Sequence, residues 1–392
     1  MTTRTGLECL LRDPSAISGR RVAVLANYAS VDRSFRYAWD LIAALPNTKL
    51  VSIWSPQHGL FGQQQANMVE TSHSRHPELQ IPVYSLYGHT REPTSEMLDG
   101  FDLLLIDLQD VGTRVYTFAW TIRACLQAAA KSGIEVWILD RPNPIGGTLI
   151  EGPMLDDQYK SFVGMESIPM RHALTLGELA IYSKNQSSID VELSVIKMSS
   201  WARNQSFGET GLPWLPPSPN VPMWQTALVY PGQVLLEGTN ISEGRGTTRP
   251  FECAGAPFID GLQLADCLNN DFELKGIRFR PIQFLPTFDK YAGKECGGVF
   301  CHITDSHHFR SLQCTVGMLA AIEKIWPGEL TWTSPPYEYE TIKMPIDILW
   351  GSDLLRKFLG NSKTVDTDSI EQICGADQAI WWSAVGEAKL YE

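Results

Sequence analysis

The sequence lacks the features that mark membrane proteins and nucleic-acid-binding proteins. No apolar stretch reaches the ~18 residues that a membrane span needs. Lysine and arginine number 32 against 44 aspartates and glutamates, which gives a formal net charge of -12. Binding a phosphate backbone requires a basic face, and a chain this acidic has no basic excess to form one. We therefore expect neither a nucleic-acid partner nor a membrane partner.

Paired cysteines and a secretory pattern are also missing. The eight cysteines form no CxxC pair, and several lie in apolar runs, as buried free thiols do. Residues 1–21 contain no apolar core followed by a cleavage site. We therefore expect a cytoplasmic protein without a disulfide framework.

Several widespread cofactor and catalytic motifs do not occur. Neither GxGxxG nor GxxxxGK[ST] follows the first predicted strand, which argues against NAD or ATP. HExxH is absent, and His307 and His308 have no nearby partner set, which makes a zinc site improbable. The GxSxG motif of many serine hydrolases is missing too. We expect a protein that uses no cofactor and no metal.

The first part of the chain alternates apolar runs with helical patterns. Runs typical of buried strands occupy residues 22–27, 49–54, 82–87, 102–108 and 135–140, and helical patterns occupy 34–45 and 116–133. Strands that are apolar on both faces and separated by helices predict a parallel sheet covered on both sides. The expected fold is α/β, with a doubly wound, Rossmann-like domain at 1–160 and a second α/β or α+β domain at 161–392.

Polar residues follow the predicted strands. Polar side chains lie at or just after the ends of these apolar runs, namely Asn27, Gln57, His58, Asp110 and Arg141. In open parallel sheets the ligand lies beyond the carboxyl ends of the strands. These residues therefore predict a ligand site at that edge of the sheet.

Structural explanations exist for several of the same residues. Asp110 lies near Arg114, and an ion pair between them would lower the pKa of Asp110 and make it a poor acid. Arg141 suits either a salt bridge or a sugar pocket. His172 precedes a probable helix, where it is either a substrate contact or a neighbour of the helix cap. A lone histidine such as His58 is as often a hydrogen-bonded structural residue as a ligand contact.

A glycine-rich, arginine-rich loop at 229–252 is the sharpest candidate for binding. Glycines on both sides of Arg245 would let the loop present its guanidinium to an anion without steric interference. Loops this long in compact proteins tend to be functional. The candidate residues of the loop are Glu237, Asn240, Glu243, Arg245 and Arg249.

Nine ordered segments resemble the family known as DUF1343, whose characterised members are exo-acting β-N-acetylmuramidases of the NamZ type. The resemblance covers nearly the whole chain, residues 20–380. The segments are SPQHGLFG, SLYG, DLQDVGTRVYT, LDRPNP, EGP, SFVGMESIPMRHALTLGELA, PSPNVP, YPGQVLLEGTNISEGRGTTRPFE and KYAGKECGGV.

This resemblance implies removal of N-acetylmuramic acid from the non-reducing end of peptidoglycan fragments, in a cleft between two domains. The partner implied is a small amino-sugar or muropeptide substrate. Its lactyl carboxylate would supply an anion for Arg245, Arg249 or Arg141.

The sequence departs from the family at one position. Many members read Pro-Glu-His-Gly where this chain has Pro56-Gln57-His58-Gly59, and that glutamate is the favoured catalytic acid. Glycoside hydrolysis usually needs two carboxyl groups. Three explanations stay open: another residue is the acid, the 2-acetamido group of the substrate acts as nucleophile while Gln57 orients it, or this branch uses another substrate or only binds. The candidate acids, in order, are Glu243, Asp110 and Glu70.

These observations lead to a hypothesis for each candidate residue. Glu243 is the general acid/base, Asp110 orients His58 or the acetamido group, and Gln57 with His58 lines the reactive side. The remaining residues contact the substrate, with Arg245 and Arg249 clamping its anionic part. They are Arg245, Arg249, Arg141, Tyr116, Arg114, Asn220, Asn240, Glu237, His172 and Glu70.

The main rival hypothesis is a sugar-binding protein that has lost the acid. A weaker rival is an amidase or esterase that uses Cys253 as its nucleophile.

Overall fold

The computed structural model describes residues 2–65, 69–361 and 365–392. Its largest element is a seven-stranded sheet in the order β3-β4-β2-β1-β5-β6-β9. Neighbouring strands are parallel except β3 and β4, which pair antiparallel at one edge. The strands are β1 (Arg21–Ala26), β2 (Lys49–Ser55), β3 (Ser74–Arg75), β4 (Pro82–Ser85), β5 (Leu103–Asp107), β6 (Glu135–Leu139) and β9 (Leu193–Ile196).

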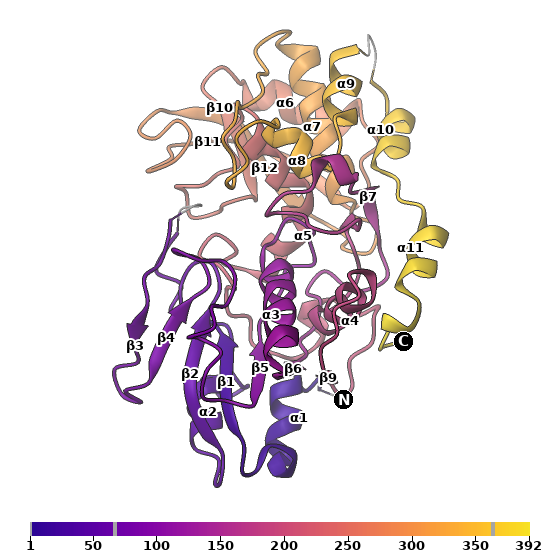
Figure 1. Ribbon diagram of the computed structural model, residues 1–392. Helices are drawn as coiled ribbons and strands as arrows, with labels where there is room; N and C mark the ends of the chain where they lie inside the picture. Colours follow the sequence, from indigo (N-terminus) through magenta and orange to yellow (C-terminus); the bar gives the residue numbers. More distant parts are fainter. Residues whose placement is uncertain (1, 66–68, 362–364) are drawn as a thin grey trace.

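Helices cover both faces of this sheet, as the apolar runs predict (Figure 1). Alternate residues of one strand point to opposite faces. In β1, Val22 and Val24 pack in a cluster with residues of α1 and α2, whereas Ala23 and Leu25 pack in the larger core with residues of α3 and α4. The helices are α1 (Gly6–Arg12), α2 (Ala38–Ala43), α3 (Phe118–Ser132) and α4 (Leu176–Gln186). The doubly wound α/β prediction is confirmed.

The strand order places a ligand crevice at a defined point. The chain moves outward from β1 through β2 to β4 on one side, and from β5 through β6 to β9 on the other. The order therefore reverses between β1 and β5, and the carboxyl ends of strands at such a switch point are where α/β sheets bind ligands.

The second unit contains a three-stranded antiparallel sheet in the order β10-β12-β11. Helix α6 packs on this sheet and on α7, and α7 contacts α5 and α10. The strands are β10 (Cys253–Ala256), β11 (Ile277–Phe284) and β12 (Cys296–Ile303). The helices are α5 (Trp224–Gln233), α6 (Gly261–Asn270), α7 (Ser311–Ile325), α8 (Pro345–Trp350), α9 (Leu354–Asn361), α10 (Thr367–Cys374) and α11 (Gln378–Val385).

Short elements complete the fold. A two-stranded ladder joins β7 (Glu151–Met154) to β8 (Pro169–Arg171). The single-turn 3₁₀ helices are η1 (Pro14–Ile17), η2 (Asp157–Tyr159), η3 (Phe207–Glu209), η4 (Val234–Gly238) and η5 (Gly386–Ala388). Within the described ranges, no helix is long and apolar enough to cross a membrane.

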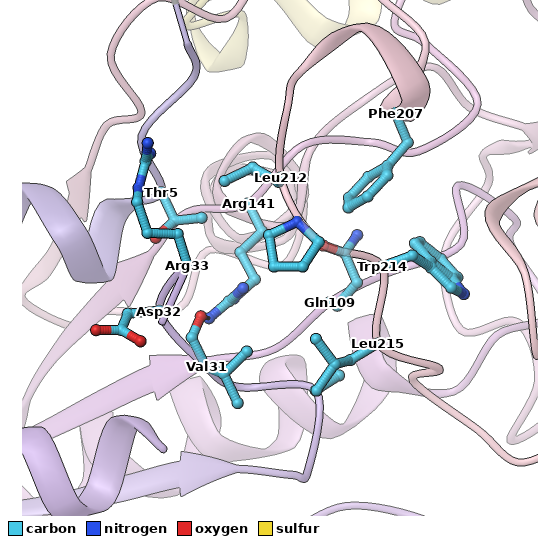
Figure 2. Close-up of a pocket in the computed structure, with 12 residues that line it drawn as sticks. Thr5, Val31, Asp32, Arg33, Gln109, Arg141, Phe207, Leu212, Trp214 and Leu215 are labelled. Atoms are coloured by element: carbon cyan, nitrogen blue, oxygen red, sulfur yellow. Dashed lines mark hydrogen bonds between the residues drawn. The ribbon is translucent and has the colours of Figure 1, made fainter. Parts of the chain in front are cut away.

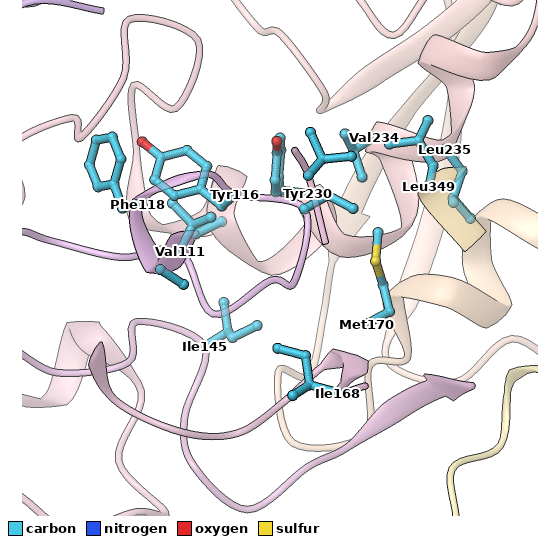
Figure 3. Close-up of a cluster of buried hydrophobic side chains, with 14 of the residues drawn as sticks. Val111, Tyr116, Phe118, Ile145, Ile168, Met170, Tyr230, Val234, Leu235 and Leu349 are labelled. Carbon is cyan, nitrogen blue, oxygen red and sulfur yellow. The ribbon is translucent and has the colours of Figure 1, made fainter. Parts of the chain in front are cut away.

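The two units share a core and exchange chain segments. One hydrophobic cluster joins Met170 and Ile168 of the first unit to Val234 and Leu349 of the second (Figure 3). Strand β9 pairs with β6, so the first sheet continues well past residue 160, where the sequence analysis placed the domain boundary. The C-terminal segment returns to the first unit, where Trp381 Nε1 donates a hydrogen bond to the carbonyl of His172 at 2.9 Å.

Candidate active site

A pocket lies where the carboxyl end of the first sheet meets the second unit. The first unit contributes the turn after β2 and the entry to α3, and the second contributes η4, the loop after it and a turn near residue 338. The lining residues are Gln57, His58, Val115, Tyr116, Thr117, Val163, Ser218, Asn220, Tyr230, Glu237, Arg245, Phe251, Tyr337 and Glu338.

His58 lines the pocket as a neutral imidazole. Strand β2 ends in a tight turn in which His58 and Gly59 have φ of 74° and 78°, a region that residues with a side chain rarely adopt. The Nδ1 atom of His58 lies 2.7 Å from the carbonyl oxygen of Gln64. Because a carbonyl only accepts, Nδ1 carries the proton and Nε2 keeps a free lone pair. Burial, with a smaller effect of the positive Arg245, lowers the pKa of His58 to about 4, although the hydrogen bond to the Gln64 carbonyl opposes the shift.

Gln57 is held by a hydrogen bond on each side of its amide. The Thr117 hydroxyl, at the start of α3, donates to Gln57 Oε1 at 2.7 Å. With that oxygen engaged, the amide nitrogen serves as the donor, and the side chain of Gln57 hydrogen-bonds to Glu338. Gln57 is therefore part of a fixed polar chain rather than a solvated turn.

Glu338 brings a carboxyl group from the second unit against the first. It is buried, and the Tyr87 hydroxyl donates to its Oε2 at 3.0 Å. Burial, together with the nearby Glu237, raises the pKa of Glu338 to about 7, although the hydrogen bonds from Tyr87 and Gln57 oppose the shift. At neutral pH this carboxyl is therefore poised between its acid and its base forms.

Glu237 has a different environment in the same pocket. Its Oε1 accepts a hydrogen bond from Arg245 Nη2 at 2.6 Å, and its Oε2 accepts one from the Tyr337 hydroxyl at 2.7 Å. The pocket thus holds two carboxyl groups with different partners: Glu237 pairs with a guanidinium, whereas Glu338 accepts from the Tyr87 hydroxyl.

The structure argues against Glu243 as the general acid. Glu243 lies 3.0 Å from Lys290 Nζ and 3.1 Å from Arg245 Nε, and it is not among the residues that line the pocket. Burial alone would raise the pKa of Glu243, but Lys290 and Arg245 outweigh that effect and hold it below its usual value. A carboxylate kept ionised in this way is a poor proton donor.

Arg245 occupies the predicted place in the glycine-rich loop but has another role. A side chain at Gly244 would meet Cys253 Sγ at 2.5 Å, so the loop packs too closely there for any other residue. The guanidinium is buried between Glu237 and Glu243, which neutralise it. This pairing disfavours the expected clamp on an anionic substrate group.

Asp110 and His172 form a buried pair outside the pocket lining. Asp110 Oδ2 accepts the Gly112 N–H at 2.9 Å and lies 3.7 Å from His172 Nε2. Burial raises the pKa of Asp110 to about 7 and lowers that of His172 to about 3. Asp110 therefore faces His172 rather than His58, contrary to the orienting role that we expected for it.

Arg114 connects the two units instead of contacting a substrate. Its guanidinium donates to the carbonyls of Leu349 and Trp350, each at 2.9 Å, and to that of Ile168. These bonds join the first unit to the end of α8 and engage the guanidinium with backbone. Backbone carbonyls, rather than the expected ion pair with Asp110, hold the guanidinium of Arg114.

Arg141 lies at a second, smaller pocket near the ends of β1 and β5. Figure 2 shows it among Val31, Gln109 and Trp214. Arg141 forms a buried salt bridge with Asp107, with Nε to Oδ1 at 2.6 Å, and also donates to the carbonyl of Val31. The structural explanation for Arg141 therefore fits better than the sugar-pocket explanation.

Three other predicted contacts divide between the pocket and its surroundings. Tyr116 and Asn220 line the pocket, and Tyr116 packs against Tyr230, as Figure 3 shows. Asn240 bonds to backbone atoms of Glu329 and Thr331 and holds its loop.

Two further predicted residues lie outside the pocket lining. Arg249 is half-exposed and pairs with Glu252 at 3.2 Å. Glu70 is exposed, 3.6 Å from Arg91.

Two models of one protein family match almost the entire chain. The model for the N-terminal domain of the exo-β-N-acetylmuramidase NamZ matches residues 22–225, and the model for its C-terminal domain matches 228–391. The chain belongs to the NamZ exo-β-N-acetylmuramidase family. The resemblance seen in the ordered motifs is confirmed.

Similar proteins agree with this family membership. The peptidoglycan β-N-acetylmuramidase NamZ of Bacillus subtilis (strain 168) is 42% identical over 332 residues, which cover 84% of this chain and 80% of that protein. Crystal structures of two DUF1343 family proteins from Bacteroides fragilis NCTC 9343 have TM-scores of 0.88 and 0.76, at 30% and 26% identity. Each alignment covers 100% of this chain and 99% of the other.

Within this NamZ-family fold, sequence reasoning missed Glu338 and Tyr337 as lining residues of the pocket, and it missed Tyr87 as the hydrogen-bond donor to Glu338. Glu338 lies far from Gln57 along the chain, in a segment without a known motif. The one available signal is the composition of Tyr337-Glu338-Tyr339, where aromatic side chains flank a carboxyl. Cys253, by contrast, is no nucleophile candidate, because burial raises the pKa of its thiol to about 12.

Proposed function

We propose that this protein is an exo-β-N-acetylmuramidase that hydrolyses the glycosidic bond of a terminal N-acetylmuramic acid in peptidoglycan fragments. The family membership and the relative of known activity supply the reaction class. The observation that supports it within this chain is the pocket itself, which contains Glu338 and Glu237 although position 57 is an amide.

The chemistry of glycoside hydrolysis matches this pocket. The departing sugar oxygen must receive a proton, and the positive charge that develops at the sugar ring must be stabilised. Glu338, with its raised pKa, is a proton source, and Glu237, held by Arg245, places a second carboxyl group in the same pocket. The neutral Nε2 of His58 adds a hydrogen-bond acceptor for a sugar hydroxyl or for water.

The aromatic lining of the pocket suits a sugar ring. Both units line the pocket, and Tyr116, Tyr230 and Phe251 supply ring surfaces against which a sugar can pack. The lactyl group of N-acetylmuramic acid would meet a pocket in which Arg245 is already paired with Glu237. This differs from the arginine clamp expected from the sequence.

The rival function is a sugar-binding protein, and the amide at Gln57 is the observation that favours it. An activity assay distinguishes the hydrolase from the binding protein. The purified protein is incubated with nitrophenyl β-N-acetylmuramide and, as a matched control substrate, with nitrophenyl β-N-acetylglucosaminide. The hydrolase account predicts release of nitrophenol from the first and much less from the second. Calorimetric binding of N-acetylmuramic acid without any release at pH 5–8 would establish the binding protein instead.

A further inference from the structure

Glu338 occupies the corner of a strained turn. The N–H of Tyr337 donates to the carbonyl of Glu340 at 2.8 Å and the N–H of Glu340 donates back to Tyr337 at 2.9 Å, which closes a two-residue hairpin. The two corner residues, Glu338 and Tyr339, have φ of 43° and 69°. Turns of this kind strongly favour Asn, Asp or Gly at both corners, because positive φ disfavours residues with large side chains. Unfavourable backbone of this sort persists where surrounding contacts hold it, and it concentrates at functional sites.

Contacts from both units hold the turn in place. On the second unit, the Tyr337 hydroxyl donates to Glu237. On the first unit, the guanidinium of Arg91 lies 3.3 Å from the centre of the Tyr339 ring, and the Tyr87 hydroxyl donates to Glu338. The carboxyl of Glu338 is thereby carried across the junction and fixed beside the turn that follows β2.

We propose that Glu338 is the general acid of this enzyme, and that Tyr87 and Gln57 position its carboxyl group. The proposal rests on the proposed function and assigns the proton donor within it. Gln57 cannot donate an acid proton, but its amide hydrogen-bonds to the residue that can.

Other carboxyl groups near the pocket are less suited to the role. Glu237 is bound by Arg245 and Tyr337, and Glu243 lies off the pocket between two cations. Asp110 is fully enclosed and faces His172 rather than the pocket. Among the pocket-lining residues of the described chain, Glu338 is thus the carboxyl group without a cationic partner in direct contact.

The charges around Glu338 support an acid that works near neutral pH. Its titratable and charged neighbours are Tyr87 on the first unit and Glu237, Arg245, Tyr230 and Tyr337 on the second. Burial and the charge of Glu237 favour the protonated form, whereas Tyr87, Arg245 and the amide of Gln57 favour the carboxylate. The pKa of about 7 follows from this balance, and an effective general acid has a pKa close to the working pH.

The proposed step breaks one glycosidic bond and transfers one proton from Glu338. The bond between the anomeric carbon and the leaving oxygen breaks, its electron pair stays on that oxygen, and the oxygen takes the proton of Glu338. One water is consumed: its hydroxyl ends on the anomeric carbon, and its other proton replaces the one that Glu338 gave. No oxidant, reductant or metal enters this balance.

The test compares two substrates that differ in their need for acid assistance. In the disaccharide of N-acetylmuramic acid linked β to N-acetylglucosamine, the leaving oxygen must be protonated. In dinitrophenyl β-N-acetylmuramide, the leaving phenolate departs without a proton. We expect Glu338→Gln to lower kcat on the disaccharide by a factor of ~10²–10⁴ and to lower it far less on the dinitrophenyl substrate. The loss of rate that the parent shows as pH rises through about 7 should disappear in the variant.

Glu340→Gln is the matched control, because Glu340 lies in the same turn but outside the pocket and uses one oxygen to accept the N–H of Ile342. It should behave like the parent on both substrates. Thermal unfolding of each variant confirms that it is folded, and Glu338→Asp, which keeps an acid in a shifted position, should recover part of the disaccharide activity.

Each outcome bears on one of the two proposals. Equal losses on both substrates, or full disaccharide activity in Glu338→Gln, would overturn Glu338 as the acid while leaving the hydrolase account intact. A parent protein that cleaves neither substrate would overturn the proposed function, and the acid assignment with it.

Discussion

Replacing Glu338 with glutamine should stabilise the folded protein at pH 8 and leave its stability unchanged at pH 4. The pKa of Glu338 rises from 4.5 to about 7 in the fold, so between these values the folded protein holds a proton that the unfolded chain has released. Stability therefore falls as pH rises through this window. At pH 8 the full penalty is roughly 3 kcal/mol, an upper estimate at ~1.36 kcal/mol per pKa unit. Glutamine has the same shape, no charge, and an oxygen that still accepts from Tyr87.

The measurement is equilibrium urea unfolding of the parent and the variant at pH 4 and pH 8. Asp110 has a raised pKa too, so the parent alone would not isolate Glu338. The difference between the two proteins does, because Asp110 is common to both. We expect a gain of about 2–3 kcal/mol at pH 8 and almost none at pH 4. A variant no more stable than the parent at pH 8 would refute the claim that burial destabilises the charged form of this carboxyl group. A loss of activity together with a gain of stability is the usual trade-off at an active site.

Three further predictions follow from the same pocket. Arg245→Met removes the cation that pairs with both Glu237 and Glu243, of which Glu243 keeps Lys290, and should cost about 3–5 kcal/mol in urea unfolding at pH 7. Arg249→Met, which breaks a half-exposed pair, should cost no more than ~1 kcal/mol. Gln57→Glu places a second carboxyl group beside Glu338 and should move the alkaline limb of the pH profile of kcat/KM to higher pH. An alkaline limb that stays at the same pH would count against contact between the two side chains. The imidazole of His58 should titrate near pH 4 by NMR, and titration near 6.5 would show that it is not buried as described.

The architecture of the first unit could be predicted from sequence because its strands are buried on both faces. Runs such as Leu103–Asp107 are apolar without interruption, which is typical of central parallel strands. The extent of the sheet could not be predicted in the same way. Strand Leu193–Ile196 is short and half-buried, and only its pairing with β6 reveals that the sheet continues past 160.

The site was partly predictable for a similar reason. Gln57 and His58 follow a strand, a parallel sheet brings strand ends to one edge, and both residues line the pocket at that edge. The sequence of a loop does not predict which charged residues will pair with its arginine. Arg245 was expected to face a substrate, and the fold instead buries it between Glu237 and Glu243.

Glu338 shows where sequence reasoning ends. Its role depends on a turn of the second unit reaching the first, and no local pattern specifies that contact. The cytoplasmic location expected from the sequence stays a prediction, since the fold does not bear on it.

The most direct measurement of the central claim uses the natural linkage and the unmodified protein. Purified enzyme is incubated with the disaccharide of N-acetylmuramic acid linked β to N-acetylglucosamine at pH 6, and the products are followed by mass spectrometry. The account predicts that the two sugars appear in equal amounts although residue 57 is a glutamine. A disaccharide that binds the protein and stays intact would contradict it.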